Sequence, residues 1–178
     1  MGLDRWVDRQ ITGLRGNALI DPIMYGASWF GDDGRGWIAI SAVRARTSST
    51  PLRAFLRQMA WLGIESGLVN GPAKALVRRP RPLGDGVVHR HHLRRPTQSS
   101  FPSGHAASAG TMAVLLSEEG LAPLWWTIAV TVGVSRIYVG VHHTSDVAAG
   151  LAVGAGFGLL ARHIRLPIVD HRPPAYGT

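Results

Sequence analysis

Cysteine is absent from the 178 residues. Its absence excludes disulfide bonds, zinc–thiolate sites and cysteine nucleophiles, and it leaves the redox compartment open. Lysine is nearly absent too, since 18 of the 19 basic residues are arginine and Lys74 is the single lysine. Because arginine is so common in this chain, a single arginine is weak evidence for a functional site. Lys74 departs from the bias and is therefore a candidate site residue.

Acidic residues are too few to balance the basic ones, and the formal net charge is +8. Such a charge suits nucleic acid, an anionic membrane surface or a phosphorylated substrate. No nucleic-acid-binding module is present to support the first of these. A signal peptide is also lacking, because charged residues interrupt the first 18 positions. The chain has no internal repeat or linker, so we expect one domain over residues 1–166 and a disordered tail over 167–178.

The first half of the chain predicts helices. Residues 3–18 have the apolar spacing of an amphipathic helix with Trp6, which suits a bilayer surface or the surface of a soluble domain. Residues 19–46 form two apolar arms around Gly-Asp-Asp-Gly at 31–34, which has the composition of a tight turn. Each arm is roughly 18 Å long, against about 30 Å for a bilayer core. The arms therefore form a short hairpin, a re-entrant element or two spans lengthened by flanking residues.

The second half predicts further helices. A hydroxyl cap before Pro51 starts a segment over 52–77 that is long enough to span, and its Glu65 should face the bundle interior. Residues 78–101 form a polar loop, and residues 105–117 and 124–141 are apolar. Glycines at 150, 154 and 158 form a stripe suited to close helix packing in lipid. We predict an all-α, integral-membrane bundle of four to six embedded helices, with an N-terminal amphipathic helix.

Two histidines and one carboxylate lie near helix ends. Asp146 follows His142 by four residues, so its carboxylate can orient the imidazole and leave one ring nitrogen as a nucleophile. Capping of the helix that begins near Thr144 is an equally good explanation of Asp146. Ser103 suits the N-cap of the next helix, which places His105 in its first turn, where it is a candidate general acid. Taken alone, His105 is better explained as a histidine at a helix start without a catalytic role. Gly104 allows phosphate oxygens to approach the backbone at that helix start.

Three cations accompany these residues. Lys74, Arg81 and Arg136 can hold a phosphate and stabilise charge in a transition state. Arg78 and Arg79 are best explained as interfacial anchors, and we assign them no catalytic role. A tract of histidine and arginine at 89–92 has no ligand set of defined spacing beside it, so we predict no metal and no cofactor.

The order and spacing of these residues resemble the type-2 phosphatidic acid phosphatase superfamily, which includes vanadium haloperoxidases and bacterial acid phosphatases. Its pattern is K-x6-RP, then PSGH, then SR-x5-H-x3-D, and residues 74–146 match all three motifs. The resemblance implies that His142 attacks phosphorus, that Asp146 orients it and that His105 protonates the leaving group. It further implies phosphate binding by five residues: Lys74, Arg81, Ser103, Gly104 and Arg136.

The resemblance implies an active site on the extracytoplasmic face of a bacterial cytoplasmic membrane, with both termini on the opposite side. Arginines near the termini and at 44–57 agree with the positive-inside rule, whereas the arginine-rich loop 78–96 does not. The motifs themselves would place the loop 78–101, the start of the 105–117 helix and the 135–146 turn on one side. The Ser48 loop, the turn at 118–123 and the C-terminus would share the other side.

The leading hypothesis is a metal-independent phosphatase acting on a lipid phosphate or diphosphate, either polyprenyl or phosphatidate-like, through a phosphohistidine. A lipid phosphotransferase and a vanadate-dependent haloperoxidase use the same motifs and remain alternatives. A soluble periplasmic acid phosphatase lacks its signal peptide here, and a purely basic binding protein would need three accidental motifs. The expected partners are the lipid substrate and membrane lipids, not nucleic acid.

Overall fold

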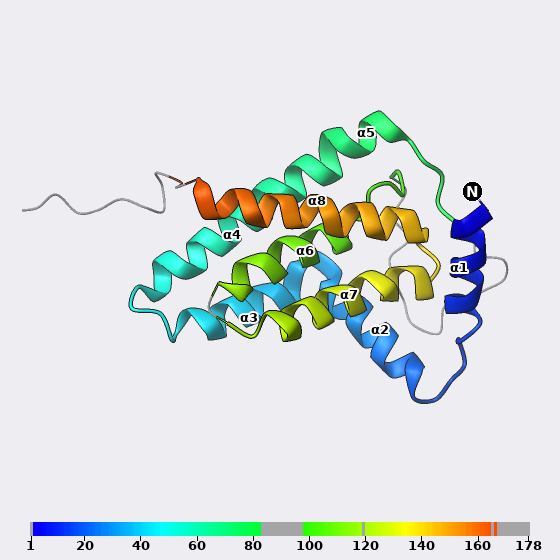
Figure 1. The fold of residues 1–178 in the computed structure, drawn as a ribbon, viewed down its shortest axis with the longest axis horizontal. Coiled ribbons are helices and arrows are strands. Elements are labelled where there is room, and N and C mark those ends of the chain that lie inside the picture. The colour runs from blue at the N-terminus through cyan, green and yellow to red at the C-terminus, as the bar shows by residue number, and fades with distance from the viewer. Residues whose placement is uncertain (1, 83–97, 119, 165, 167–178) are drawn as a thin grey trace, which may run out of the picture.

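The computed structural model of the protein describes residues 2–82, 98–118, 120–164 and 166, and this part of the chain is helical without strands (Figure 1). The predicted all-α class is confirmed. The helices are α1 (Gly2–Thr12), α2 (Ile20–Gly31), α3 (Arg35–Ala45), α4 (Pro51–Leu68), α5 (Lys74–Val77), α6 (Gly104–Ser117), α7 (Ala122–Tyr138) and α8 (Thr144–His163), with a 3-10 turn η1 (Asp32–Gly34) and a π-helical turn η2 (Val69–Ala73). The predicted tail and most of the predicted polar loop lie outside the described residues.

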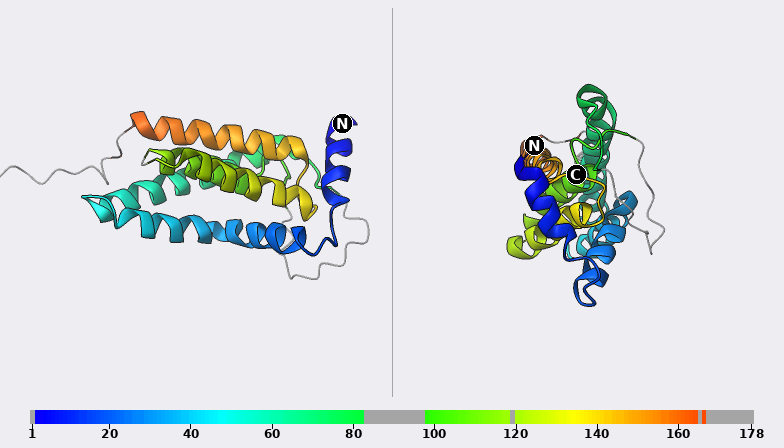
Figure 2. Two further views of the ribbon diagram at one scale, coloured as in Figure 1. Left: turned by 60° about the horizontal axis from the view of Figure 1, so that its bottom comes forward. Right: turned by 90° about the vertical axis from the view of Figure 1, so that its right-hand side faces the viewer.

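Helices α2 and α3 form one rod with a break at η1, not a hairpin (Figures 1 and 2). The expected chain reversal at 31–34 is therefore wrong. Asp32 is extended, and the next two residues, Asp33 and Gly34, have positive φ values of 53° and 70°. Glycine and aspartate favour helix breaks and turns alike, so their composition does not show whether the chain turns back. The rod covers 20–45, roughly 39 Å at 1.5 Å per residue.

A second rod runs from α4 through η2 to α5. Helix α4 starts at Pro51 as predicted, although no side-chain cap bond is made by Thr50. Pro72 lies inside the π-helical turn, where a missing N–H donor interrupts the α-helical ladder directly before Lys74. Glu65 is fully buried and accepts a 2.8 Å hydrogen bond from Ser108 Oγ, so the prediction that it faces the bundle interior is confirmed.

Helix α6 lies at the centre of the bundle and packs most closely on α8. The three predicted glycines of α8 are buried on this contact. A Cβ atom added to Gly154 would lie 1.9 Å from the carbonyl oxygen of Ala107, and one added to Gly150 would lie 2.5 Å from that of Ser103. The stripe is thus required for the two backbones to approach, which confirms its predicted packing role.

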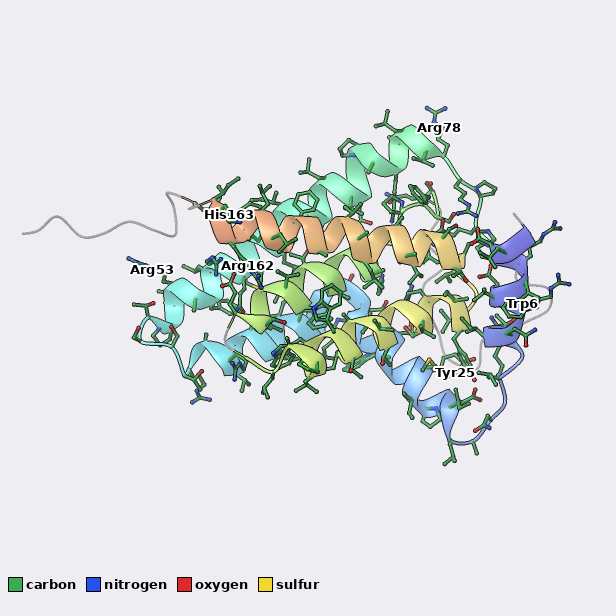
Figure 3. The ribbon with its side chains drawn as sticks, viewed as in Figure 1. Trp6, Tyr25, Arg53, Arg78, Arg162 and His163 are labelled. Carbon is green, nitrogen blue, oxygen red and sulfur yellow. The ribbon has the colours of Figure 1, made fainter. Side chains whose placement is uncertain are left out.

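Helix α1 lies across one end of the bundle, roughly perpendicular to the long axis (Figures 1 and 2). Trp6 is 59% exposed and points away from the bundle, whereas Asp4 and Asp8 bond to the start of α8 (Figure 3). The motif-bearing segments share this end, as predicted, and α8 ends at the opposite end beside the α6–α7 turn. The expectation that both termini lie opposite the site is wrong for α1, because α2 and α3 run along the bundle as one rod and not as two antiparallel helices (Figure 2).

Candidate active site

A cavity of about 1100 Å³ opens among the helices and gathers the predicted motif residues. It is lined by the side chains of Lys74, Arg81, His105, Arg136 and His142, together with the backbone of Gly104. These residues come from α5, the segment after it, α6, α7 and the α7–α8 connection. The tertiary structure therefore brings the three separate motifs to one site.

The imidazole of His142 is buried and held by the backbone. Its Nδ1 lies 2.7 Å from the carbonyl oxygen of Ser100, a position that only an Nδ1–H group can use as a hydrogen bond. The proton is therefore on Nδ1, and Nε2 keeps its lone pair, 3.3 Å from Arg81 Nη1. Burial draws the pKa of His142 down to about 4, and Arg81 and Arg136 act in the same direction against the Asp146 carboxylate. The ring is neutral at pH 7.

Asp146 does not make the predicted direct bond to His142, since its Oδ2 lies 3.8 Å from His142 Nδ1. The carbonyl of Ser100 occupies that position instead. Asp146 is the third residue of α8, and its Oδ2 accepts the backbone N–H of His143 at 2.8 Å. The capping explanation is thus confirmed, and the carboxylate also places a negative charge beside the imidazole. A role of Asp146 in orienting His142 stays a prediction.

Arg79 supports Asp146 from behind, a role that the sequence did not indicate. Its Nη1 donates to Asp146 Oδ1 at 2.7 Å, and its Nη2 donates to Asp4 Oδ2 at 2.7 Å. Burial alone would lower the pKa of Arg79, but bonding to Asp4 and Asp146 raises it above its ordinary value. Arg78, the neighbouring residue, has a φ of 44° and points outward at the end of α5 (Figure 3). Of the two arginines interpreted from the sequence as interfacial anchors, Arg79 contacts Asp146 and Arg78 does not.

The acidic face of α1 completes this support. Asp4 accepts bonds from both the backbone N–H and the hydroxyl of Ser145, at 3.0 and 2.7 Å. Asp8 does the same for Thr144, at 2.9 and 2.7 Å. These are the first residues of α8, where helical N–H groups lack intrahelical partners and favour negative charge. The amphipathic helix predicted from residues 3–18 therefore docks by its charged face and leaves Trp6 outside.

The three predicted phosphate-binding cations line the cavity from different elements. Lys74 is 8% exposed and donates a 2.6 Å bond to Asn70 Oδ1. Arg81 is fixed by carbonyl oxygens, including that of Val141 at 2.7 Å. Arg136 is 3% exposed and donates to Ser28 Oγ. Burial lowers the pKa of Arg81, while the charge of Asp146 opposes that shift. Three preplaced cations in one cavity favour an anion.

The start of α6 forms another wall of the cavity. Ser103 is the N-cap, as predicted, and its Oγ accepts the N–H of Ala106 at 3.4 Å. Ser103 is fully buried and does not line the cavity, so its predicted phosphate contact is not supported by its side chain. Gly104 lines the cavity, and a Cβ there would lie 2.5 Å from Asn70 Oδ1. A larger residue at position 104 would therefore require the side chain of Asn70, which bonds Lys74, to shift.

Asp32 is a second residue that the sequence did not single out. It lies at the break between α2 and α3, and its Oδ1 is 2.8 Å from His105 Nε2 and 3.6 Å from Arg136 Nη1. The sequence offered only a turn at this position. A charged residue in the middle of an apolar segment was the available signal, since such residues in membrane helices usually face a polar interior.

Within the described ranges, no group of three histidine, cysteine, aspartate or glutamate residues is arranged to hold a metal ion. The tract at 89–92 lies outside these ranges. The absence of a metal or cofactor requirement stays a prediction.

In this helical bundle a neutral histidine and three cations line one cavity, an arrangement suited to an anionic group such as phosphate. Comparison with known proteins identifies it further: the family model described as PAP2 superfamily matches residues 55–169. The chain therefore belongs to the PAP2 superfamily, as its three motifs indicated.

Two curated relatives are phosphatases of prenyl lipids. Decaprenylphosphoryl-5-phosphoribose phosphatase of Mycobacterium tuberculosis is 34% identical over 140 residues, which cover 76% of this chain and 75% of the relative. Undecaprenyl-diphosphatase of Sulfolobus acidocaldarius is 42% identical over 77 residues, covering 39% of this chain and 35% of the relative.

Solved structures show the same fold. The transmembrane PAP2-type phosphatidylglycerolphosphate phosphatase of Bacillus subtilis superposes with a TM-score of 0.71 at 24% identity, covering 91% of this chain and 84% of the other. Aquifex aeolicus LpxE superposes with a TM-score of 0.67 at 27% identity, covering 91% of this chain and 96% of the other.

Proposed function

We propose that the protein is an integral-membrane phosphatase that hydrolyses a lipid phosphate or diphosphate through a phosphohistidine on His142. One observation carries the proposal. The Nδ1–H of His142 is tied to the Ser100 carbonyl at 2.7 Å, which leaves Nε2 as a lone pair beside Arg81 and the other cations of the cavity. A neutral imidazole with one nitrogen fixed and the other unprotonated is the form required of a nitrogen nucleophile.

The reaction follows from these positions. Lys74, Arg81 and Arg136 hold the phosphate, and the Nε2 lone pair of His142 attacks phosphorus. The P–O bond to the lipid breaks, and protonated His105 gives a proton to the leaving oxygen. A water molecule then attacks the phosphorus atom and loses a proton to His105, the P–N bond to Nε2 of His142 breaks, and inorganic phosphate leaves while His142 regains its lone pair.

The other wall of the cavity favours a lipid. Trp29 and Ile38 line it from the α2–α3 rod, and Met59 and Leu62 line it from α4. An apolar chain beside a cationic phosphate site fits a prenyl or acyl phosphate, and the two prenyl-lipid relatives favour the prenyl class. The volume of about 1100 Å³ also leaves room for a sugar or a second phosphate next to the reacting group.

The bundle is proposed to span the membrane five times, as the α2–α3 rod, the α4–α5 rod, α6, α7 and α8. By length and apolar composition alone, one described helix, Thr144–His163, qualifies as a span. The other passes carry polar residues that face the cavity or its surroundings, as Glu65 and Arg136 do. The α1 end of the bundle, which holds the site, is proposed to face the extracytoplasmic side.

Orientation is tested by cysteine labelling, which this cysteine-free chain allows without background. Gln10→Cys places a thiol on the exposed side of α1, and Ser49→Cys places one in the loop at the opposite end. A membrane-impermeant maleimide applied to intact cells should label the Gln10→Cys variant and spare the Ser49→Cys variant. The reverse pattern would place the site on the cytoplasmic side.

Activity is tested by phosphate release from detergent-purified protein in EDTA. The substrates are polyprenyl phosphate, polyprenyl diphosphate, a prenyl-phosphoryl sugar phosphate and phosphatidate. We expect His142→Ala to abolish release and His163→Ala, an exposed histidine at the far end of α8, to leave it unchanged (Figure 3). Wild-type protein given ³²P-labelled substrate should carry an acid-labile, alkali-stable label that His142→Ala lacks. If the wild-type protein and both variants release no phosphate from any of these lipids, the proposal is contradicted.

Two alternatives are separated in the same assay. Adding a glycerol or sugar acceptor would reveal phosphotransfer as a phosphorylated acceptor formed at the expense of inorganic phosphate. Vanadate with bromide and peroxide would reveal haloperoxidase activity. No described feature of the site favours either over hydrolysis.

A further inference from the structure

The cavity contains a carboxylate where a phosphate-binding site would be expected to avoid one. Asp32 and Asp33 are the two acidic side chains among its described lining residues. Asp33 is 68% exposed and pairs with Arg35 at 2.9 Å, on the outer side of the break. Asp32 is 29% exposed and turns towards the centre, where Lys74, Arg81 and Arg136 would hold an anion. A negative charge there weakens phosphate binding, so its presence calls for another role.

The backbone is shaped to bring Asp32 to His105. The break between α2 and α3 holds Asp32 extended and is followed by two residues of positive φ. At Gly31, the preceding residue, an added Cβ would lie 2.8 Å from His105 Cδ2 and 3.1 Å from Val132 Cγ1. The helix end thus lies directly against the imidazole. As a result, Asp32 Oδ1 reaches His105 Nε2 at 2.8 Å, a distance typical of a charge-assisted hydrogen bond.

We infer that Asp32 is a positioning residue for His105 that fixes the imidazole ring and favours its protonated form for proton transfer to the leaving oxygen. This inference rests on the proposed function. The carboxylate accepts the Nε2–H of His105, so Nδ1–H is the proton that the imidazolium gives up, and Nε2–H is retained throughout. In the second step Nδ1 takes the proton of the attacking water. The roles of the two histidines then differ. Burial and the neighbouring cations keep His142 neutral while a carbonyl fixes its tautomer, and a carboxylate favours the charged form of His105.

The surrounding charges explain why His105 needs such a partner. The charged groups that face it are Asp32 from η1, Arg136 from α7 and Lys74 from α5. Burial and the two cations disfavour a protonated imidazole, and Asp32 is the described side chain that opposes them. Asp32 lies outside the segment that matches the family, residues 55–169, so the family motifs do not assign this role.

The test compares Asp32→Asn with Asp33→Asn, which removes the neighbouring carboxylate on the outer side of the break. Phosphate release from a polyprenyl phosphate in mixed micelles is measured at saturating substrate across pH 4–10, with full-length protein. We expect Asp32→Asn to lower the maximal rate about 10- to 100-fold, the range of a weakened general acid. The basic limb of its pH profile should also move to lower pH, because the amide no longer favours protonated His105. Asp33→Asn removes a carboxylate that does not contact His105, so the basic limb of its profile should stay at the wild-type pH.

Two results would overturn the inference. One is an Asp32→Asn variant with the rate and profile of Asp33→Asn. The other is a slower variant with an unchanged basic limb, which would make Asp32 a structural or charge-balancing residue only. Should Asp32→Asn fail to fold, the ¹⁵N spectrum of wild-type histidines, assigned with His105→Gln, decides the matter. A protonated Nε2 bonded to carboxylate supports the inference, and an unprotonated Nε2 contradicts it. If the wild type itself releases no phosphate, the proposed function fails, and the spectrum still reports the contact.

Discussion

Replacing Arg79 with glutamine should damage the protein far more than the same change at Arg78. Arg79 joins the fully buried Asp146 to Asp4 by two 2.7 Å bonds, so its loss leaves a buried carboxylate without its cation. Removing one partner of a buried ion pair costs about 3–5 kcal/mol. Here the Arg79 side chain is 24% exposed and Asp146 keeps the N–H of His143, so we expect about 2–3 kcal/mol.

The assay is thermal unfolding in detergent, followed by the fluorescence of the six tryptophans. For a chain of this size, 2–3 kcal/mol corresponds to a fall in Tm of about 5–10 °C. Activity should also fall by about tenfold or more, equivalent to about 1.4 kcal/mol, because Asp146 anchors the backbone next to His142. Arg78→Gln is the matched control and should change stability by less than about 0.5 kcal/mol.

Equal Tm and equal activity in the two variants would refute this reasoning, because Arg79 would then contribute no more to stability and activity than the exposed Arg78. The double variant with Asp4→Asn adds a second check. Residues that share one ion-pair network are not additive, so the double variant should lose less stability than the sum of the two single changes.

Three further predictions concern other parts of the structure. Because the pKa of His142 is lowered to about 4, its ¹⁵N signals should report a neutral ring down to about pH 5, and a midpoint near 6.5 would contradict its burial among cations. Hydrogen bonds from Ser145 and Arg79 overcome burial and lower the pKa of Asp4 to about 2, so its stabilising contribution is present above pH 3.8 and is lost as the pH falls towards 2. Asp4→Asn should therefore lower Tm at pH 7 and leave it nearly unchanged near pH 2. Gly154→Ala should lower the Tm in detergent by several degrees, because the added Cβ atom would overlap the α6 backbone. Gly156→Ala, on the open face of the same helix, should leave the Tm unchanged. Equal Tm values for the two variants would show that α6 and α8 do not pack closely.

Much of the site followed from sequence because its residues come in short, regularly spaced sets. The spacing from Lys74 to Arg81, the helix start at Ser103 and the four-residue step from His142 to Asp146 are local patterns, and each has a local structural consequence. The glycine stripe of α8 could be predicted for the same reason, and the burial of Glu65 because a carboxylate inside an apolar helix is costly unless it faces the bundle interior. In a helix, spacing alone decides which residues share a face, so the sequence already carries this information.

Tertiary structure decided the contacts that join distant segments. Asp32 meets His105, Arg79 links Asp4 to Asp146, and the Ser100 carbonyl takes the His142 bond that sequence spacing had assigned to Asp146. None of these pairs has a period that marks it in the sequence. The path of the chain at 31–34 belongs to the same group, since its glycines and aspartates permit a reversal or a break. In the folded protein the continuous rod packs α2 on α7 and α3 on α4, and these contacts lie between segments far apart in the sequence or separated by a loop.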